Sequence, residues 1–454
     1  MTSRVILLLA RSVGLSLTVA LLASALAFAA ALLTGRRITR ALAPWFLSAM
    51  LIPPCVFAQG WIFFFDRLAI PFSGGLGAIW VSVFYFFPLC FALIGYGLQA
   101  LDRAEWDAAA LALPPLARLR AVILPQSRHL LVSAGLLTFL LALGDFSIPA
   151  GFQVNVYAMD VYAQFSVRGD GLSAFLHALP LLAITLGAAV LGYSSFRSLV
   201  LAQSAPPGGK PVRGGRIAAA ATGALLSVPI TALVFSLPTP AALLEACRDS
   251  VGGLMSTLRF GVLAALTTLP PAFAAAWWLG RRPGRLVYGL IALPLAVPAP
   301  LAGVALIALF IRTPLYGTFW PLGFGYAVRL TPIAAMALFF LVRSRDRDAA
   351  GARRLFQRNA GFGLFRIALP SYIPALVVGG ACAFALSAGE TAVTLLLVPP
   401  GASPLSLTTY NLLHYGAGDL VAATCFLLFC ACALVVGITM GLRCIYLRRS
   451  YAPA

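Results

Sequence analysis

Charged residues are scarce in this sequence. Only 10% of its 454 residues are Asp, Glu, Lys or Arg, whereas 61% are hydrophobic, and the mean hydropathy is +0.96. A soluble chain of this length could not hide so much apolar surface in one core. The composition therefore excludes a soluble globular protein and indicates one that is solvated by lipid.

Histidine is scarce too, and the residue types that build active sites form no recognisable group. The three histidines are His129, His177 and His414, and none has a nucleophile or base partner at catalytic spacing. The chain also lacks the phosphate-binding pattern Gly-x-x-x-x-Gly-Lys-Ser/Thr, so it cannot bind ATP by that route. The sequence thus predicts no catalytic residue.

The eight cysteines lie mostly inside apolar segments. Cys425, Cys430 and Cys432 share one such segment without a histidine or acidic partner. Their pattern is typical of small side chains within helices, and it predicts neither a metal site nor a cofactor bound by this chain.

Long apolar runs are what the chain has in abundance. Segments of about 20 residues can cross a bilayer as helices. The first run continues to Leu33 and stops at Gly35-Arg36-Arg37, which favours a retained span over a signal peptide. The sequence predicts about eleven spans, at 12–34, 43–65, 76–99, 127–149, 173–195, 217–237, 256–279, 286–309, 320–342, 371–397 and 419–442.

The basic residues indicate the orientation of these spans. The formal net charge is +19, which in a soluble protein would suggest nucleic acid as a partner. Most of the 32 basic residues, however, fall in alternate connections between spans. Positive residues accumulate on the cytoplasmic side, so these connections are expected inside and the N-terminus outside, with no role for nucleic acid.

The chain contains an internal repeat, because the same landmarks return at a constant spacing. Adding 245 to each residue number pairs Gly35-Arg36-Arg37 with Gly280-Arg281-Arg282, Pro53 with Pro298, Leu124-Pro125 with Leu369-Pro370, and Gly144-Asp145 with Gly389-Glu390. The sequence therefore predicts two parallel, pseudo-symmetric five-helix units, at 1–197 and 256–454.

Two parallel units with an odd number of spans need an odd number of crossings between them. The Pro-, Gly- and basic-rich stretch 198–216 is typical of a cytoplasmic linker. Residues 217–255 then supply one connecting span and an outer segment with helical spacing of apolar residues, which predicts a short helix on the membrane surface.

Prolines recur at the same place in the second span of each unit. Pro53 and Pro298 each interrupt an apolar run. Because proline removes a hydrogen bond from a helix, it predicts a broken helix at both positions. Such a break lines a water-filled pathway or is a tolerated kink, and the repeat favours the pathway.

Two carboxylates, Asp145 and Glu390, follow Gly144 and Gly389 near the outer end of a span. An ionisable group inside a bilayer is costly and is a functional candidate. Either both carboxylates line the solute pathway, which would favour a cation, or they are structural. In the structural alternative they accept backbone N–H groups at a helix break or pair with Arg329.

The connections before Pro125 and Pro370 share an unusual pattern, an acidic residue and an Ala pair followed later by Leu-Pro. In the first copy Glu105 precedes Asp107-Ala108-Ala109, and Leu113 follows. The second copy reads Asp348-Ala349-Ala350-Gly351. The pattern resembles the EAA loop, Glu-Ala-Ala-x-x-x-Gly followed by Ile-x-Leu-Pro, of permease subunits of bacterial ABC importers. Asp replaces Glu in both copies, and Leu113 stands where the family has Gly.

The duplicated arrangement resembles the fused permeases of the ferric-iron, thiamine and polyamine importers. This resemblance implies an all-α, polytopic, MetI-like inner-membrane protein whose two loops dock on two copies of a cytoplasmic ATPase subunit. It also implies a periplasmic solute-binding protein as a partner, and ATP and magnesium held by the ATPase. The expected activity is import of a small solute, with a cation such as iron(III) favoured.

An ion-gradient-driven secondary transporter is the alternative, because duplicated halves and intramembrane carboxylates fit it as well. Such a transporter would have no need of two acidic-Ala-Ala loops in register. An intramembrane enzyme is a third class, for which the sequence supplies no motif.

Overall fold

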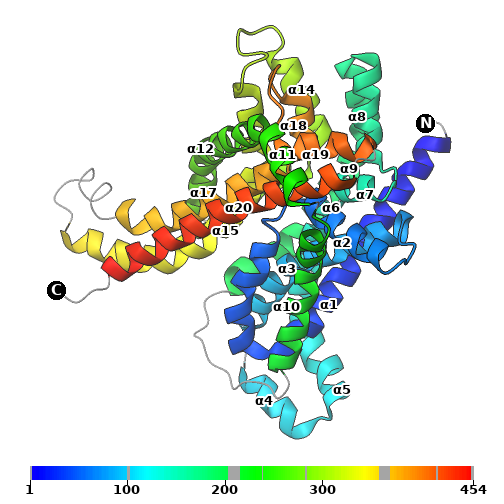
Figure 1. Cartoon of the computed structure of the whole chain (residues 1–454). Helices are drawn as coiled ribbons and strands as arrows, with labels where there is room; N and C mark the ends of the chain where they lie inside the picture. Colours follow the sequence, from blue (N-terminus) through cyan, green and yellow to red (C-terminus); the bar gives the residue numbers. More distant parts are fainter. Residues whose placement is uncertain are drawn as a thin grey trace. The chain divides into compact units, whose positions relative to one another are not determined.

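The structure is a computed structural model that describes residues 3–99, 103–202, 215–237, 239–281, 284–356, 369–415 and 418–450. These residues form helices and short connections, and no strand occurs among them (Figure 1). Together with the apolar composition, this arrangement makes the chain an all-α, polytopic membrane protein.

The described residues of the first half, up to and including the connecting span, form eleven elements. They are α1 Ser3–Ala49, α2 Pro54–Arg67, α3 Gly74–Gln99, α4 Arg103–Ala112, α5 Pro115–Arg118, the π-helix η1 Leu119–Ile123, α6 Leu124–Gly144, α7 Ser147–Gly151, α8 Tyr157–Arg168, α9 Gly171–Ala202 and α10 Gly215–Phe235.

The second half begins with a short helix in the segment where the sequence predicts one, and the location of this helix on the outer membrane surface stays a prediction. Its elements are α11 Pro240–Asp249, α12 Val251–Arg281, α13 Arg285–Ala296, α14 Ala299–Phe310, α15 Trp320–Phe356, α17 Leu369–Gly389, α18 Thr391–Leu397, α19 Leu405–Tyr415 and α20 Gly418–Ser450.

Eight helices of the described residues are long and apolar enough to cross a membrane, and α13 with α14 forms a ninth, broken candidate. Each corresponds to one of the expected spans. The expected span 43–65 is divided between the end of α1 and α2, and the expected span 320–342 lies within α15. A total of eleven spans stays a prediction.

Helix breaks occur where the sequence predicts them. Gly35 has φ 71°, a left-handed conformation that interrupts α1 at the end of its apolar run. Residues 50–53 separate α1 from α2, and Pro298 separates α13 from α14, which are bent by 94°. Proline explains both breaks, because its ring displaces the preceding turn and it has no N–H to donate.

The helix bounds follow the internal repeat. Adding 245 to the bounds of α6, Leu124–Gly144, gives those of α17, Leu369–Gly389, and adding it to the start of α2 gives the start of α14. A short helix follows α6 and α17 after a break of one or two residues. The pseudo-symmetry of two complete units stays a prediction.

The described chain divides into two compact units. The first contains residues up to Met50, Phe57–Val167 and Leu176–Phe235. The second contains everything from Ser236 on, together with Leu51–Val56 and Arg168–Phe175 from the first half of the sequence. The predicted boundaries at 197, 216 and 255 follow the sequence repeat rather than this packing and stay a prediction.

The connecting span α10 packs within the first unit. A Cβ atom on Gly60 of α2 would lie 2.1 Å from the carbonyl oxygen of Pro229, so the two backbones touch. At the end of α10, Arg67 donates to the carbonyl oxygen of Phe235 and lies over its ring. The predicted linker 198–216 overlaps the ends of α9 and α10, and its residues 203–214 lie outside the described part.

Candidate functional site

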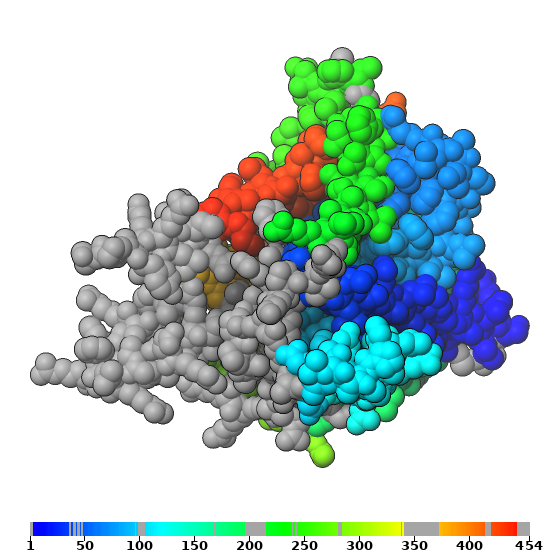
Figure 2. Space-filling model, turned by 90° about the horizontal axis from the view of Figure 1, so that it is seen from below, coloured from blue at the N-terminus to red at the C-terminus, as the bar shows by residue number. Residues whose placement is uncertain are grey.

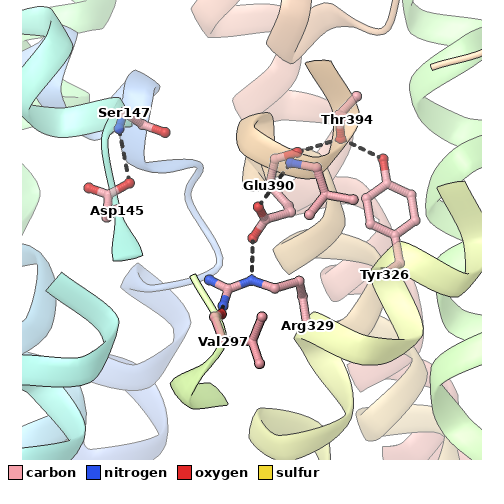
Figure 3. A network of polar contacts seen from close by, with 8 residues as sticks. Asp145, Ser147, Val297, Tyr326, Arg329, Glu390 and Thr394 are labelled. Atoms are coloured by element: carbon pink, nitrogen blue, oxygen red, sulfur yellow. Dashed lines mark hydrogen bonds and ion pairs between the residues drawn. The ribbon is translucent and has the colours of Figure 1, made fainter. Parts of the chain in front are cut away.

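The clearest polar cluster of the second unit lies where two helix breaks face one long helix. Arg329 of α15 donates from Nη1 to the carbonyl oxygen of Val297 at 3.1 Å. Its Nε lies 3.8 Å from Oε2 of Glu390, the residue between α17 and α18 (Figure 3). One side chain therefore joins the break at Pro298 to the break after Gly389.

The sequence explains why a cation is needed here. Val297 directly follows the last residue of α13, and Pro298 comes next. The helical hydrogen bonding is therefore interrupted at this turn. A carbonyl oxygen inside an apolar span must find a donor within the protein. Arg329 supplies that donor from α15.

Both charged side chains are largely withdrawn from the surface. Arg329 has 10% and Glu390 16% of its side chain exposed. Nε of Arg329 has no hydrogen-bond partner in the described part of the chain, because 3.8 Å is an ion-pair contact rather than a hydrogen bond. The pair thus neutralises two charges that would be costly in a bilayer, although the two groups are too far apart for a hydrogen bond.

Glu390 also begins the short helix α18, since its side chain accepts from the backbone N–H of Val393 at 3.5 Å. α18 is fixed to α15 by a 2.9 Å hydrogen bond between the hydroxyls of Tyr326 and Thr394 (Figure 3). A Cβ atom on Gly325 would lie 2.4 Å from Val393, so these helices are in close contact. α15 therefore holds both the end of α17 and the start of α18.

The predicted pathway residues Pro53 and Gly389 meet in the second unit. A Cβ atom on Gly389 would lie 2.7 Å from Cδ of Pro54 and 3.2 Å from Cα of Pro53. Gly389 is therefore required for close packing as well as for ending α17. Pro298 belongs to the same unit, beside the carbonyl group that Arg329 binds.

Asp145 occupies the matching position of the first unit, directly after Gly144, the last residue of α6. Its carboxylate accepts from the backbone N–H of Ser147 at 3.0 Å and of Ile148 at 3.3 Å. It thereby caps the short helix α7. The two carboxylates differ in one respect, because α3, the counterpart of α15, contains no Arg or Lys.

These contacts match the structural alternative for both carboxylates, namely acceptance of backbone N–H groups and pairing with Arg329. A role for Asp145, Glu390, Gly144, Gly389, Pro53 and Pro298 in lining a pathway stays a prediction. The link from Arg329 to Val297 was not foreseen, although a single Arg inside an apolar span was its signal in the sequence.

The first acidic-Ala-Ala loop is a separate short helix, α4, followed by α5 and η1. In Figure 1 it lies at one end of the first unit, and in Figure 2 the cyan surface of this region is open to view. Glu105, Asp107 and Ala108 are exposed, whereas Ala109 is buried and Leu113, just after α4, is half-buried. The two alanines of the pair thus face different surroundings.

An apolar feature of this loop was missed by the sequence analysis. Leu111 is 92% exposed and Leu116 is 58% exposed, on either side of Pro114-Pro115. Large apolar side chains this far from their own core are candidates for contact with another protein.

The second acidic-Ala-Ala loop differs in its backbone. Asp348, Ala349, Ala350 and Gly351 lie in the last turns of α15, a continuous helix of 37 residues. The basic stretch that follows, 357–368, lies outside the described residues. The register of this loop relative to the first stays a prediction.

The first unit also contains a polar group that the sequence analysis did not find. Nε2 of His177 lies 2.7 Å from Oδ2 of Asp160, and Tyr157 stacks on the His177 ring. The Tyr157 hydroxyl donates to the His177 carbonyl oxygen at 2.6 Å. Burial, and secondarily the charge of Asp160, raises the pKa of the Tyr157 hydroxyl. The sequence did not predict the contact between His177 and Asp160, because the two residues are 17 positions apart.

No family model matches the chain. It is 30% identical over 202 residues to the molybdenum transport system permease protein ModB of Escherichia coli strain K12. The match covers 40% of this chain and 88% of that protein. The protein of the same name from Escherichia coli O157:H7 matches equally.

Proposed function

Because the chain belongs to the family of ABC importer permeases that includes ModB, we propose that it forms the complete membrane pathway of one importer. It is a transport subunit of a multi-pass inner-membrane complex. The pathway carries a small solute from the periplasm to the cytoplasm and opens alternately to each side.

One observation carries this proposal. The match covers 88% of ModB but only 40% of this chain, so this chain is about twice as long as its relative. Within this chain the same landmarks return at a constant spacing, including the bounds of α6 and α17. A chain with two such units supplies two halves of a pathway in one polypeptide.

The energy source is a separate subunit. The chain has no phosphate-binding loop, so ATP and magnesium belong to a partner, present in two copies because the loop occurs twice. The exposed acidic and apolar side chains of α4 and α5 support docking of one copy at Asp107, Leu111 and Leu116. A periplasmic solute-binding protein delivers the solute at the outer face.

Two observations bear on the solute, and they favour opposite charges. The two carboxylates led to the expectation of a cation, although Arg329 offsets the charge of Glu390. The relative is named for molybdenum, which in neutral water is an oxyanion. We propose a small inorganic ion, with iron(III) and the molybdenum oxyanion as the first two solutes to compare.

The test is uptake into proteoliposomes that contain the permease and its co-purified ATPase, with ATP inside and the binding protein and solute outside. ATP-dependent uptake of one labelled solute from the panel supports the proposal. Uptake that follows an ion gradient without any ATPase would favour the secondary transporter instead.

The docking loop has its own test. Asp107→Arg and Ala108→Trp change exposed positions, so transport should fall while the permease remains folded. Ala109→Trp is unsuitable as a docking probe because Ala109 is buried within the first unit and a larger side chain would disturb the fold. Wild-type uptake in both surface variants would remove α4 from the docking site.

A further inference from the structure

One side chain joins the docking helix α4 to the membrane helix α6. Gln126, in the first turn of α6, accepts through Oε1 from the indole N–H of Trp106 at 2.9 Å. Its amide nitrogen donates to Oε2 of Glu105. Both polar ends of Gln126 are thus engaged by consecutive residues of α4, 20 and 21 positions earlier in the chain.

The covalent route between the same helices is longer and less regular. From α4 the chain passes Pro114-Pro115, then α5, then the π-helix η1. The π-turn is explained by Pro125, which cannot donate and whose ring would clash with the carbonyl group four residues earlier. The backbone N–H of Leu124 instead reaches the carbonyl oxygen of Leu119.

The segment beyond Gln126 is firmly packed. Leu130, one turn further along α6, is fully buried. A Cβ atom on Gly97 of α3 would lie 2.3 Å from Leu130, so α3 and α6 touch at this level. Ser127 is also buried and donates to the Ile123 carbonyl oxygen. A displacement applied at Gln126 therefore acts on two closely packed helices, α3 and α6.

We propose that Gln126 is a positioning residue that transmits movement of α4 to α6. Without it, a force on α4 is taken up by bending at Pro114-Pro115 and at η1, and α6 stays in place. With it, α4 and the start of α6 move as one body. The inference rests on the proposed function, because it assumes that α4 receives the force from an ATPase.

A purely local role, in which Gln126 only stabilises the loop, makes a different prediction. It would lower the amount of assembled complex, and the solute transported per ATP hydrolysed would not change. The informative readout is therefore that ratio, measured on assembled complexes of permease, ATPase and binding protein in proteoliposomes.

The central variant is Gln126→Leu, which keeps the size of the side chain and removes both hydrogen bonds. The expected result is normal co-purification of the ATPase with transport per ATP reduced about fivefold or more, the range of a typical coupling between sites. Arg120→Gln, at an exposed position of η1 outside this contact, is the matched control and should leave the ratio unchanged.

An exchange of the two side chains provides the rescue. Glu105→Gln combined with Gln126→Glu restores a donor opposite an acceptor and leaves a carboxylate oxygen for the Trp106 indole. Gln126→Glu alone opposes two carboxylates and should resemble Gln126→Leu. The double variant should recover most of the transport ratio.

Two results would overturn the proposed role of Gln126. An unchanged ratio in assembled Gln126→Leu overturns the proposal, and so does a double variant as impaired as Gln126→Glu. If Gln126→Leu fails to assemble, the double variant alone decides. Failure of the wild-type chain to recruit any ATPase would instead overturn the proposed function.

Discussion

The contact between Arg329 and Glu390 is open to a quantitative test. Arg329→Met preserves much of the stem and removes the guanidinium group. It leaves the Val297 carbonyl oxygen without its 3.1 Å donor and Glu390, 16% exposed, without its cation. A buried unsatisfied acceptor costs about 1–3 kcal/mol. An uncompensated buried charge costs about 3–5 kcal/mol.

The geometry places the expected loss below the combined range of about 4–8 kcal/mol. The ion pair is 3.8 Å long, and the Val393 N–H still reaches Glu390. We therefore expect Arg329→Met to lower the free energy of unfolding by about 3 kcal/mol. Glu390→Gln keeps an acceptor for Val393 and leaves Arg329 bonded to Val297, so a loss of about 2 kcal/mol is expected.

The double variant separates the charge interaction from the rest. With both charges removed, the cost reduces to the unsatisfied carbonyl group, about 1–3 kcal/mol. The cycle should therefore give a coupling energy of about 2–4 kcal/mol, because the single losses sum to about 5 kcal/mol. The measurement is denaturant unfolding in mixed micelles, with exposed Arg312→Met as the control. Losses that add to within about 0.5 kcal/mol would refute an interaction between the two charges.

Three further predictions follow from individual contacts. Gly60→Ala should destabilise the first unit by about 1–3 kcal/mol, because its Cβ atom would lie 2.1 Å from the Pro229 carbonyl oxygen. Gly187→Ala, with nothing within 4 Å, should be neutral or slightly stabilising in the same unfolding assay. Tyr157→Phe removes a 2.6 Å hydrogen bond and should cost about 0.5–1.5 kcal/mol. Because burial raises the Tyr157 pKa, the wild-type chain should lose stability as the pH rises above about 10, and Tyr157→Phe should show a smaller loss in a pH series.

The parts of the fold that sequence could predict are those set by local chemistry. The ends of α6 and α17 coincide with Gly144 and Gly389, and the breaks at Pro53 and Pro298 follow from the missing N–H of proline. Each depends on a residue and its immediate neighbours. The repeat then predicted the second copy from the first.

The parts that sequence could not predict depend on contacts between distant segments. Arg329 was named only as a partner for the carboxylates, and its bond to Val297 requires α15 to pass both breaks. The burial of Ala109 beside exposed Ala108 likewise depends on how α4 rests on α5 and η1. The sequence did not predict that α15 continues into the second loop, because the Ala and Arg residues there are equally typical of a short separate helix.

Two segments from the first half of the sequence belong to the second unit, namely Leu51–Val56 and Arg168–Phe175. They affect how the chain can be divided into two polypeptides. The polypeptide passes between the units at each end of both segments and again after Phe235. A cut in the connection after Phe235 removes one of these passages and leaves the others intact. Two polypeptides made from separate genes and divided at this point would each be incomplete alone and would have to fold together, because the first would supply two segments of the second unit.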